Sequence, residues 1–132
     1  MGGGHTYVQF DRYTQWTEYG FRFRAVKAVH SDPFAIGVMI EDLENSRVYY
    51  ITGDTLYSEE IFADLPDHID VVFLPINGVG NNMNVTDAVR FFHDCGATRA
   101  VPYHVGMFDT LTPEIFEAEG RILPKLYKEQ EI

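Results

Sequence analysis

Cysteine, basic residues and long apolar runs are all scarce in this chain of 132 residues. Its single cysteine, Cys95, excludes an internal disulfide and fits a reducing compartment, so we expect a cytoplasmic protein. Ten Lys and Arg against twenty Asp and Glu give a formal charge of −10, and no basic cluster offsets it. Nucleic acid is therefore excluded as a partner. No apolar run has membrane-spanning length and no basic-then-apolar signal opens the chain, so no membrane association is expected.

The residues that are abundant indicate a folded protein. Hydrophobic residues make up 45% of the chain and aromatic residues 14%, a composition that excludes intrinsic disorder. The length suits one domain with a real core, so we expect a single domain over residues 1–132. The glycine-rich start, residues 1–6, is expected to be a flexible N-terminus.

Hydrophobic periodicity and turn residues divide the chain into short strands followed by an alternation of helices and strands. The expected strands are Tyr7–Phe10, Gln15–Trp16, Phe21–Val29, Ala35–Glu41, Arg47–Thr52, Val71–Ile76 and Arg99–His104. The expected helices are Ser58–Leu65, Asn84–Cys95 and a last one that opens at Thr112-Pro113-Glu114. Antiparallel strands that lead into β-α-β-α predict an α/β fold with a mixed sheet, α+β by layer, and helices on one face.

Three potential metal ligands follow strands of this predicted sheet. Asp54 closes the stretch VYYITGD, His104 closes AVPYH, and His30 closes AVKAVH. An isolated Gly-Asp-Thr is more often a turn, and a single His after a strand is more often a surface residue than a ligand. Three such residues at one rim of a sheet favour a metal site, since imidazole and carboxylate groups suit Zn, Mn and Fe alike.

Four segments then resemble the C-terminal half of metallo-β-lactamase-fold hydrolases, and the branch they are most similar to is the L-ascorbate-6-phosphate lactonase type. The segments are AVHSDPFAIGVMIE, VYYITGDTLYSEE, DVVFLPINGVGNNMNVTDAV and AVPYHVGMFD. The resemblance covers roughly residues 16–110. It implies half of an αββα sandwich, in which two sheets pack face to face and helices cover the outsides.

The resemblance also implies roles for particular residues. Asp54 would bridge two metal ions, and His30 and His104 would each ligate one of them, with Zn or Mn as the expected metal and Fe as a third option. The loop after Val71–Ile76 resembles the family loop beside the mouth of the active site. Asn77, Gly78 and Asn82 of that loop are candidate substrate contacts, and a plain Gly/Asn-rich connection is an equally good interpretation.

One family motif is absent from this sequence. The principal metal motif, His-x-His-x-Asp-His, needs two histidines separated by a single residue, and none of the five histidines here are so spaced. His68 precedes a strand, at the end opposite the rim, and His93 lies inside a predicted helix, so neither replaces the motif. Four ligands and the general base are thus missing, and no catalytic residue can be named.

Two hypotheses of function remain. The first is a metal-dependent hydrolase, lactonase-like on a small-molecule substrate such as a sugar-phosphate ester or lactone. The isolated chain would be inactive, because its metal centre is incomplete. The alternative is a non-catalytic, truncated or relic half-domain that acts only through folding and oligomerisation.

The half-fold also predicts an assembly. Its sheet would expose the face that the other half of the sandwich covers in the family. Candidates for that face are Phe21, Phe23, Ile36, Val38, Val48, Tyr50 and part of Val71–Ile76. A soluble monomer rarely leaves such an apolar patch in water. We therefore expect a homodimer or a higher homo-oligomer that covers it.

Overall fold

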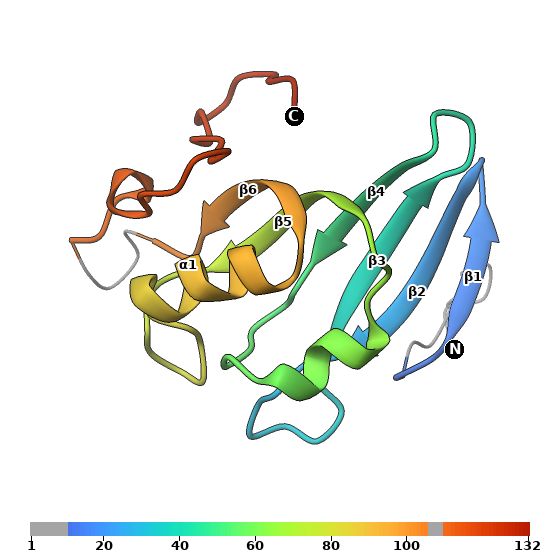
Figure 1. Ribbon diagram of the computed structural model, residues 1–132, viewed down its shortest axis with the longest axis horizontal. Coiled ribbons are helices and arrows are strands. Elements are labelled where there is room, and N and C mark those ends of the chain that lie inside the picture. The colour runs from blue at the N-terminus through green and yellow to red at the C-terminus, as the bar shows by residue number, and fades with distance from the viewer. Residues whose placement is uncertain (1–10, 106–109) are drawn as a thin grey trace, which may run out of the picture.

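A mixed sheet of six strands organises the backbone (Figure 1). The structure is a computed structural model that describes residues 11–105 and 110–132. The strands lie side by side in chain order, β1 to β6. This arrangement, with its few helices, confirms the predicted fold class. The strand expected at Tyr7–Phe10 and the flexible start at residues 1–6 lie outside the described residues.

The first four strands are antiparallel, and short turns join the first to the second and the third to the fourth, whereas a loop over residues 28–35 joins the second to the third. They are β1 (Gln15–Glu18), β2 (Phe21–Lys27), β3 (Ile36–Asp42) and β4 (Arg47–Ile51). The turn between β1 and β2 has a φ of 50° at Tyr19 and 80° at Gly20. Two positive φ values in succession match the right-handed twist of the flanking strands, which is why a two-residue turn closes this hairpin.

The last strands are parallel to β4, and helices make the connections. They are β5 (Ile69–Pro75) and β6 (Ala97–Tyr103). A 3₁₀ helix, η1 (Glu59–Asp64), precedes β5, and the α-helix α1 (Val85–Asp94) connects β5 to β6. Both helices were expected, although η1 adopts the tighter 3₁₀ form. Parallel pairing places the carboxyl ends of β4, β5 and β6 at one edge of the sheet.

The second strand ends two residues earlier than predicted. The backbone N–H of Lys27 donates to the carboxylate of Asp64 at 2.9 Å, and the N–H of Val29 donates to Thr55 Oγ1 at 2.8 Å. The two backbone N–H groups bind these side chains instead of a neighbouring strand, so the strand does not continue. Arg12 binds the same Asp64 carboxylate through two contacts of 3.0 Å. Burial by itself raises the pKa of Asp64, but these hydrogen bonds together hold it below its usual value.

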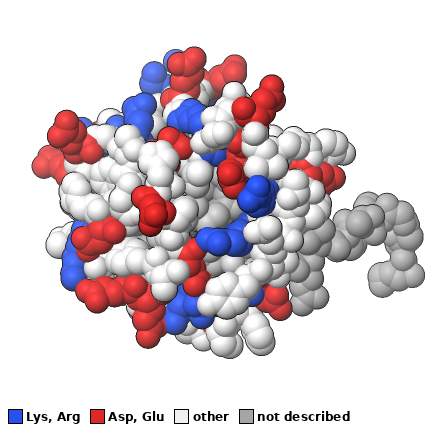
Figure 2. Space-filling model, turned by 45° about the vertical axis from the view of Figure 1, so that its right-hand side comes forward, with Lys and Arg blue, Asp and Glu red and all other residues white. Residues whose placement is uncertain are grey.

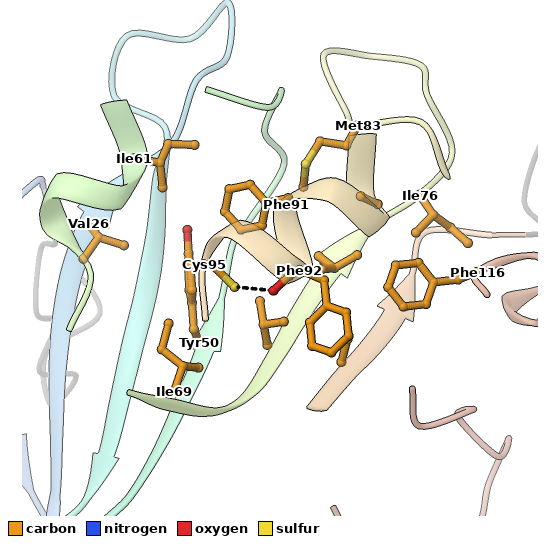
Figure 3. Packing of buried hydrophobic residues seen from close by; sticks show 14 of the residues in the cluster. Val26, Tyr50, Ile61, Ile69, Ile76, Met83, Phe91, Phe92, Cys95 and Phe116 are labelled. Atoms are coloured by element: carbon orange, nitrogen blue, oxygen red, sulfur yellow. Dashed lines mark hydrogen bonds between the residues drawn. The ribbon is translucent and has the colours of Figure 1, made fainter. Parts of the chain in front are cut away.

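Helix α1 has the ends that its sequence predicts. The Asn84 side chain accepts a hydrogen bond from the Asp87 N–H at 2.8 Å, and Gly96 follows the helix with a φ of 76°. The inner side of α1 packs on the sheet through Phe91, which is fully buried (Figure 3). Its ring lies 6.2 Å from that of Tyr50 on β4 and 5.2 Å from that of Phe62 on η1. Both helices therefore cover the same face of the sheet.

The prediction of a helix that begins at Thr112 is wrong. Only a single 3₁₀ turn, η2 (Pro113–Ile115), forms there, and the Thr112 side chain makes no capping hydrogen bond. Phe116 instead turns into the main core, and the backbone of residues 120–122 pairs with Ala100 of β6. Burial of Phe116 and Ile122 and pairing at the sheet edge outweigh the local helix signals.

The face of the sheet opposite the helices is also apolar. Two cross-strand rows run over it: Trp16, Phe23, Ile40, Tyr49 and Val71, and beside them Ala25, Val38, Ile51, Phe73 and Val101. Ile122 and Ile132 from the C-terminal segment pack on the end of these rows that β4, β5 and β6 form. No described helix lies on this side, which we call the open face.

Two of the residues expected on the open face lie on the other side of the sheet. Tyr50 pairs with Met39 and Val72, and all three belong to the core under the helices. Val48 lies on the same side of β4 as Tyr50, because side chains alternate along a strand. The run of β-branched and aromatic residues in β4 gives no alternation of polar and apolar residues, so the sequence could not set its orientation.

Charged side chains are dispersed over the surface. On the side of the molecule that Figure 2 shows, Lys and Arg lie singly or in small groups among Asp and Glu. The face drawn there has no extended basic patch among the described residues. Across residues 11–105 and 110–132, no helix combines the length and apolar character that a bilayer crossing requires.

Cys95 should react slowly with thiol reagents in the native protein. It is 7% exposed, and its Sγ lies 3.3 Å from the carbonyl oxygen of Phe92 (Figure 3). Burial raises the pKa of the thiol to about 11, so the reactive thiolate is scarce below that pH. The test is labelling by a disulfide reagent at pH 8, with the denatured chain as the fast control. Complete labelling of the native chain at the denatured rate would contradict this placement.

Candidate metal and substrate site

The carboxyl ends of three parallel strands bring the candidate residues together. Asp54 follows β4 after two residues, and His104 directly follows β6. The strand between them, β5, leads into the loop over residues 76–84, which contains the predicted substrate contacts. Asp54, the loop over residues 76–84 and His104 therefore lie at the same rim of the sheet, as predicted. Such a rim is where open α/β sheets commonly bind ligands.

Asp54 lies between two buried threonines that fix its backbone. The N–H of Thr52 donates to the carbonyl of Phe73 on β5 at 3.0 Å, and Thr55 is fully buried. Gly53 has a φ of 67°, and a Cβ there would lie 2.5 Å from the carbonyl oxygen of Ile36. Glycine is therefore required by both the backbone conformation and the space. The result is an exposed carboxylate on a rigid support.

The Asp54 and His104 side chains meet at this rim. The Asp54 Oδ1 and His104 Nδ1 atoms are 3.2 Å apart, and the two side chains are 47% and 40% exposed. His104 has a φ of 62°, an uncommon conformation for a residue with a side chain. Strained backbone of this kind persists only where the surroundings enforce it, and it is enriched at functional sites.

The loop after β5 packs beneath His104. Asn82 of this loop is 6% exposed, and its Nδ2 lies 3.3 Å from the same His104 Nδ1 atom. Backbone hydrogen bonds hold the loop: Gly78 N–H donates to the Met83 carbonyl at 3.0 Å, and Met83 N–H donates to the Thr55 carbonyl at 2.9 Å. The loop is thus tied to the segment that carries Asp54.

His30 lies apart from this pair. It is half-buried in the loop after β2, and its Nδ1 accepts a hydrogen bond from the Asp32 N–H at 3.1 Å. The part of the chain that the structure describes contains no group of three or more His, Cys, Asp or Glu side chains that could hold a metal ion. An indirect link exists, because Asn81 Nδ2 donates to Ser31 Oγ at 3.0 Å. The ligand role of His30 stays a prediction.

A pocket of about 580 Å³ adjoins the Asp54–His104 pair. Two of the three predicted substrate residues, Asn77 and Asn82, line it. Gly78 is not among the lining residues and instead turns the loop, with a φ of 70°. A Cβ on this residue would lie 3.0 Å from the Cβ of Asn84, which is too close. The pocket volume suits a small organic molecule.

Several pocket residues carried no signal that sequence reasoning could use. Val101, Pro102 and Tyr103 line it from β6, and Pro124 reaches it from the C-terminal segment. Burial raises the pKa of the Tyr103 hydroxyl, so this side chain is a neutral wall of the pocket. A proline 20 residues beyond His104 along the chain has no motif that would connect it to the site.

The histidines set aside in the sequence analysis lie away from the rim. His68 precedes β5 and its Nε2 is 3.0 Å from Asp70 Oδ1. His93 is exposed on α1, where its ring lies 5.3 Å from that of Phe92. Neither takes part in the pocket.

Solved structures identify the class of fold. The metallo-beta-lactamase fold protein YhfI from Bacillus subtilis superposes with a TM-score of 0.65 at 20% identity, over 78% of this chain and 44% of that one. The metallo hydrolase Igni18 from Ignicoccus hospitalis gives a TM-score of 0.62 at 20% identity, over 85% of this chain and 48% of that one. The sheet and its helices therefore form part of a metallo-β-lactamase sandwich.

The family follows from the sequence match. Residues 4–105 match the model of the beta-lactamase superfamily domain, and the chain belongs to that superfamily. A curated relative from Alkaliphilus metalliredigens, named a UPF0173 metal-dependent hydrolase, is 33% identical over 85 residues. That match covers 63% of this chain and 37% of the relative, so the chain spans well under two thirds of its relatives' length.

Asp54 and His104 at the rim can supply some of the ligands of a metal site. A carboxylate oxygen and an imidazole nitrogen are donors that divalent metals accept, and Asp54 and His104 present one of each at 3.2 Å. Among the His, Cys, Asp and Glu side chains of the described ranges, no third joins them. Two side chains do not make a complete protein site, which has three or four ligands.

Gly53→Ala should destabilise the protein more than Gly20→Ala. Both glycines have positive φ, so each substitution costs about 1–2 kcal/mol in backbone strain. A Cβ at Gly20 meets nothing within 4 Å, whereas a Cβ at Gly53 collides with the Ile36 carbonyl. The measurement is the free energy of unfolding in urea. Equal losses for the two variants would show that the close contact at Gly53 does not constrain the chain.

Proposed function

We propose that this chain provides part of the metal centre of a metal-dependent hydrolase of the metallo-β-lactamase superfamily. The supporting observation is the pairing of Asp54 with His104, 3.2 Å apart at the carboxyl edge of the parallel strands and beside a pocket. The family match supplies the second support. Zn, Mn and Fe all remain candidate metals for such a donor pair.

The chain's own residues would hold the site and orient the substrate. A bound divalent metal lowers the pKa of its water and polarises a carbonyl group, which is the chemistry that ester hydrolysis needs. Asp54 and His104 would contribute to holding that metal. Asn77 and Asn82, which line the pocket, would contact the substrate. The remaining ligands and the general base would come from outside the described residues.

For the substrate we propose a small ester or lactone, by resemblance to the ascorbate-6-phosphate lactonase branch. Among the described residues, the pocket lining contains neither Lys nor Arg. Three basic residues of β2 lie elsewhere: Arg22 and Arg24 line a separate hollow on the helix-covered side, and Lys27 pairs with Glu60. A neutral ester or lactone therefore fits the described pocket better than a phosphorylated one.

Metal content tests the proposed function. The purified chain should contain Mn, Zn or Fe by elemental analysis, and Asp54→Ala should remove it, since a bridging carboxylate contributes to every site that can form. His93→Ala is the matched control, because His93 is exposed on α1 away from the rim, and its metal content should equal that of the wild type. Metal retained by Asp54→Ala would overturn the assignment. A wild-type chain without metal would favour the non-catalytic half-domain.

We further propose that a second copy of this chain covers the open face. The uncovered part of the helix side, over β1 to β3, carries Gln15, Arg22, Arg24 and Glu41, which suits contact with water. The same strands present apolar residues to the open face, among them Trp16, Phe23 and Ile40. Two copies of a chain with a charge of −10 repel each other, so an apolar face is where they can associate. A two-fold contact is the commonest arrangement.

Light scattering at low micromolar concentration should give twice the monomer mass of 15.1 kDa. Ile40→Glu should return the protein to a monomer, because Ile40 lies in the middle of the open face between Phe23 and Tyr49. Glu41→Gln is the control, since the adjacent side chain points to the helix side and should leave the mass unchanged. A compact wild-type monomer would refute the second copy.

A further inference from the structure

The His104 Nδ1 atom has two polar neighbours that make incompatible demands. Asp54 Oδ1 lies 3.2 Å away and Asn82 Nδ2 lies 3.3 Å away. The carboxylate can only accept a hydrogen bond, so it requires a proton on Nδ1. The amide NH₂ can only donate, so it requires a lone pair on Nδ1. One ring nitrogen cannot satisfy both in any protonation state.

Within the described ranges, the buried side of the Asn82 amide offers no partner to either end of the amide, so only the contact with His104 decides its orientation. Asn82 is 6% exposed, and its Oδ1 has no hydrogen-bond partner among the described residues. A buried polar atom without a partner costs about 1–3 kcal/mol. The oxygen and nitrogen of an amide are assigned from their hydrogen-bond network, and here that network disfavours the orientation with Nδ2 toward His104. Turning the amide by 180° directs its oxygen at the rim.

With the amide turned, two acceptor oxygens lie beside His104 Nδ1, which is itself an acceptor in its unprotonated form. The three atoms are a carboxylate oxygen of Asp54, an amide oxygen of Asn82 and the Nδ1 of His104. Ligands that share a divalent metal at about 2.0–2.2 Å, in tetrahedral or octahedral geometry, lie roughly 3.0–3.5 Å from one another. The separations of 3.2 and 3.3 Å at His104 Nδ1 fall within this range.

We propose that the Asn82 side-chain oxygen is a third donor, beside Asp54 and His104, to a divalent metal ion. This inference rests on the proposed function, because it adds a ligand to the same site. An amide oxygen is a hard donor, and carbonyl and carboxylate oxygens suit Mn²⁺ better than the soft thiolate-binding metals. The site therefore accepts Mn²⁺ through two oxygens and one nitrogen of this chain.

The position of Asn82 supports a ligand that is held in place. Its backbone N–H donates to the Val79 carbonyl at 3.2 Å, and the next residue, Met83, is fully buried and bonded to Thr55. The loop that carries the amide oxygen is thus attached to the backbone that carries Asp54. Ligands must be positioned in this way before a metal arrives, since ordering them on binding would weaken the affinity.

The experiment is a Mn²⁺ titration of the full chain, followed by electron paramagnetic resonance of the free ion. Asn82→Leu keeps the approximate size of the side chain and removes the oxygen. Asn82→Asp keeps the shape and replaces the amide by a carboxylate, which cannot donate to His104. Asn45→Ala is the control, because Asn45 is an asparagine in the β3–β4 turn, away from the rim, and its side chain donates to Asp42 Oδ2 at 2.7 Å. Circular dichroism checks that each variant folds.

The Kd for Mn²⁺ should rise by about tenfold or more in Asn82→Leu, since even residues that only support a metal ligand contribute about 10–100-fold. In Asn82→Asp the Kd should stay equal or fall, because the added charge attracts the cation. Asn45→Ala should match the wild type. If Asn82→Leu does not fold, Asn82→Asp decides the question by itself.

The contrary outcomes separate this inference from the proposed function. Wild-type binding of Mn²⁺ that is unchanged in folded Asn82→Leu, or weakened in Asn82→Asp, overturns the role of Asn82 and leaves the metal site standing. A wild-type chain that binds no Mn²⁺ at millimolar concentration overturns the Mn²⁺ site as a whole, Asn82 included.

Discussion

A close contact between two backbones at the end of β4 determines the geometry of the whole rim. Gly37 and Gly53 face each other there: a Cβ on Gly37 would lie 2.9 Å from the Thr52 carbonyl, and one on Gly53 would lie 2.5 Å from the Ile36 carbonyl. Because neither residue has a side chain, β3 and the end of β4 approach more closely than any other residue would allow. This approach directs the chain out of the sheet at Asp54.

Thr55, the residue after Asp54, connects this part of the backbone to two neighbouring loops through hydrogen bonds. Its hydroxyl accepts the N–H of Val29 at 2.8 Å, and its carbonyl accepts the N–H of Met83 at 2.9 Å. The loop with His30 and the loop with Asn82 are both anchored to the residue that follows Asp54. The exposed Asp54 carboxylate and the buried Asn82 amide are thereby attached to one stretch of backbone, and the half-buried His30 ring lies in a loop attached to the same residue.

Over β1 to β3, the two faces of the sheet differ in polarity. On the helix side, where η1 and α1 do not reach, the strands carry charged residues such as Arg22 and Glu41. On the open face most alternate positions are apolar, with Glu18 and Asp42 as charged exceptions beside Phe21. The C-terminal segment covers the end of this face formed by β4, β5 and β6, through Ile122 and Ile132. The same segment brings Pro124 to the pocket, so the covering of the face and the wall of the site are built from one stretch of chain.

The sequence by itself determined the strands and helices whose local signals agree with their surroundings. Alternating residues predicted β2, the Asn84 cap and Gly96 predicted α1, and the order of elements predicted a mixed sheet with Asp54 and His104 at one rim. The missing His-x-His motif is likewise a property of the sequence alone.

Only the tertiary structure decided the features that depend on distant contacts. The signals at Thr112 favour a helix, but burial of Phe116 and pairing with β6 prevent it. The run of apolar residues in β4 carries no information about orientation, so packing on Phe91 assigns Tyr50 to the helix side. Asn82 is one of several asparagines in its loop, and its burial against His104 distinguishes it from Asn81, which faces Ser31 instead. Local patterns specify local backbone, whereas burial and the convergence of side chains arise from residues that lie far apart in the sequence.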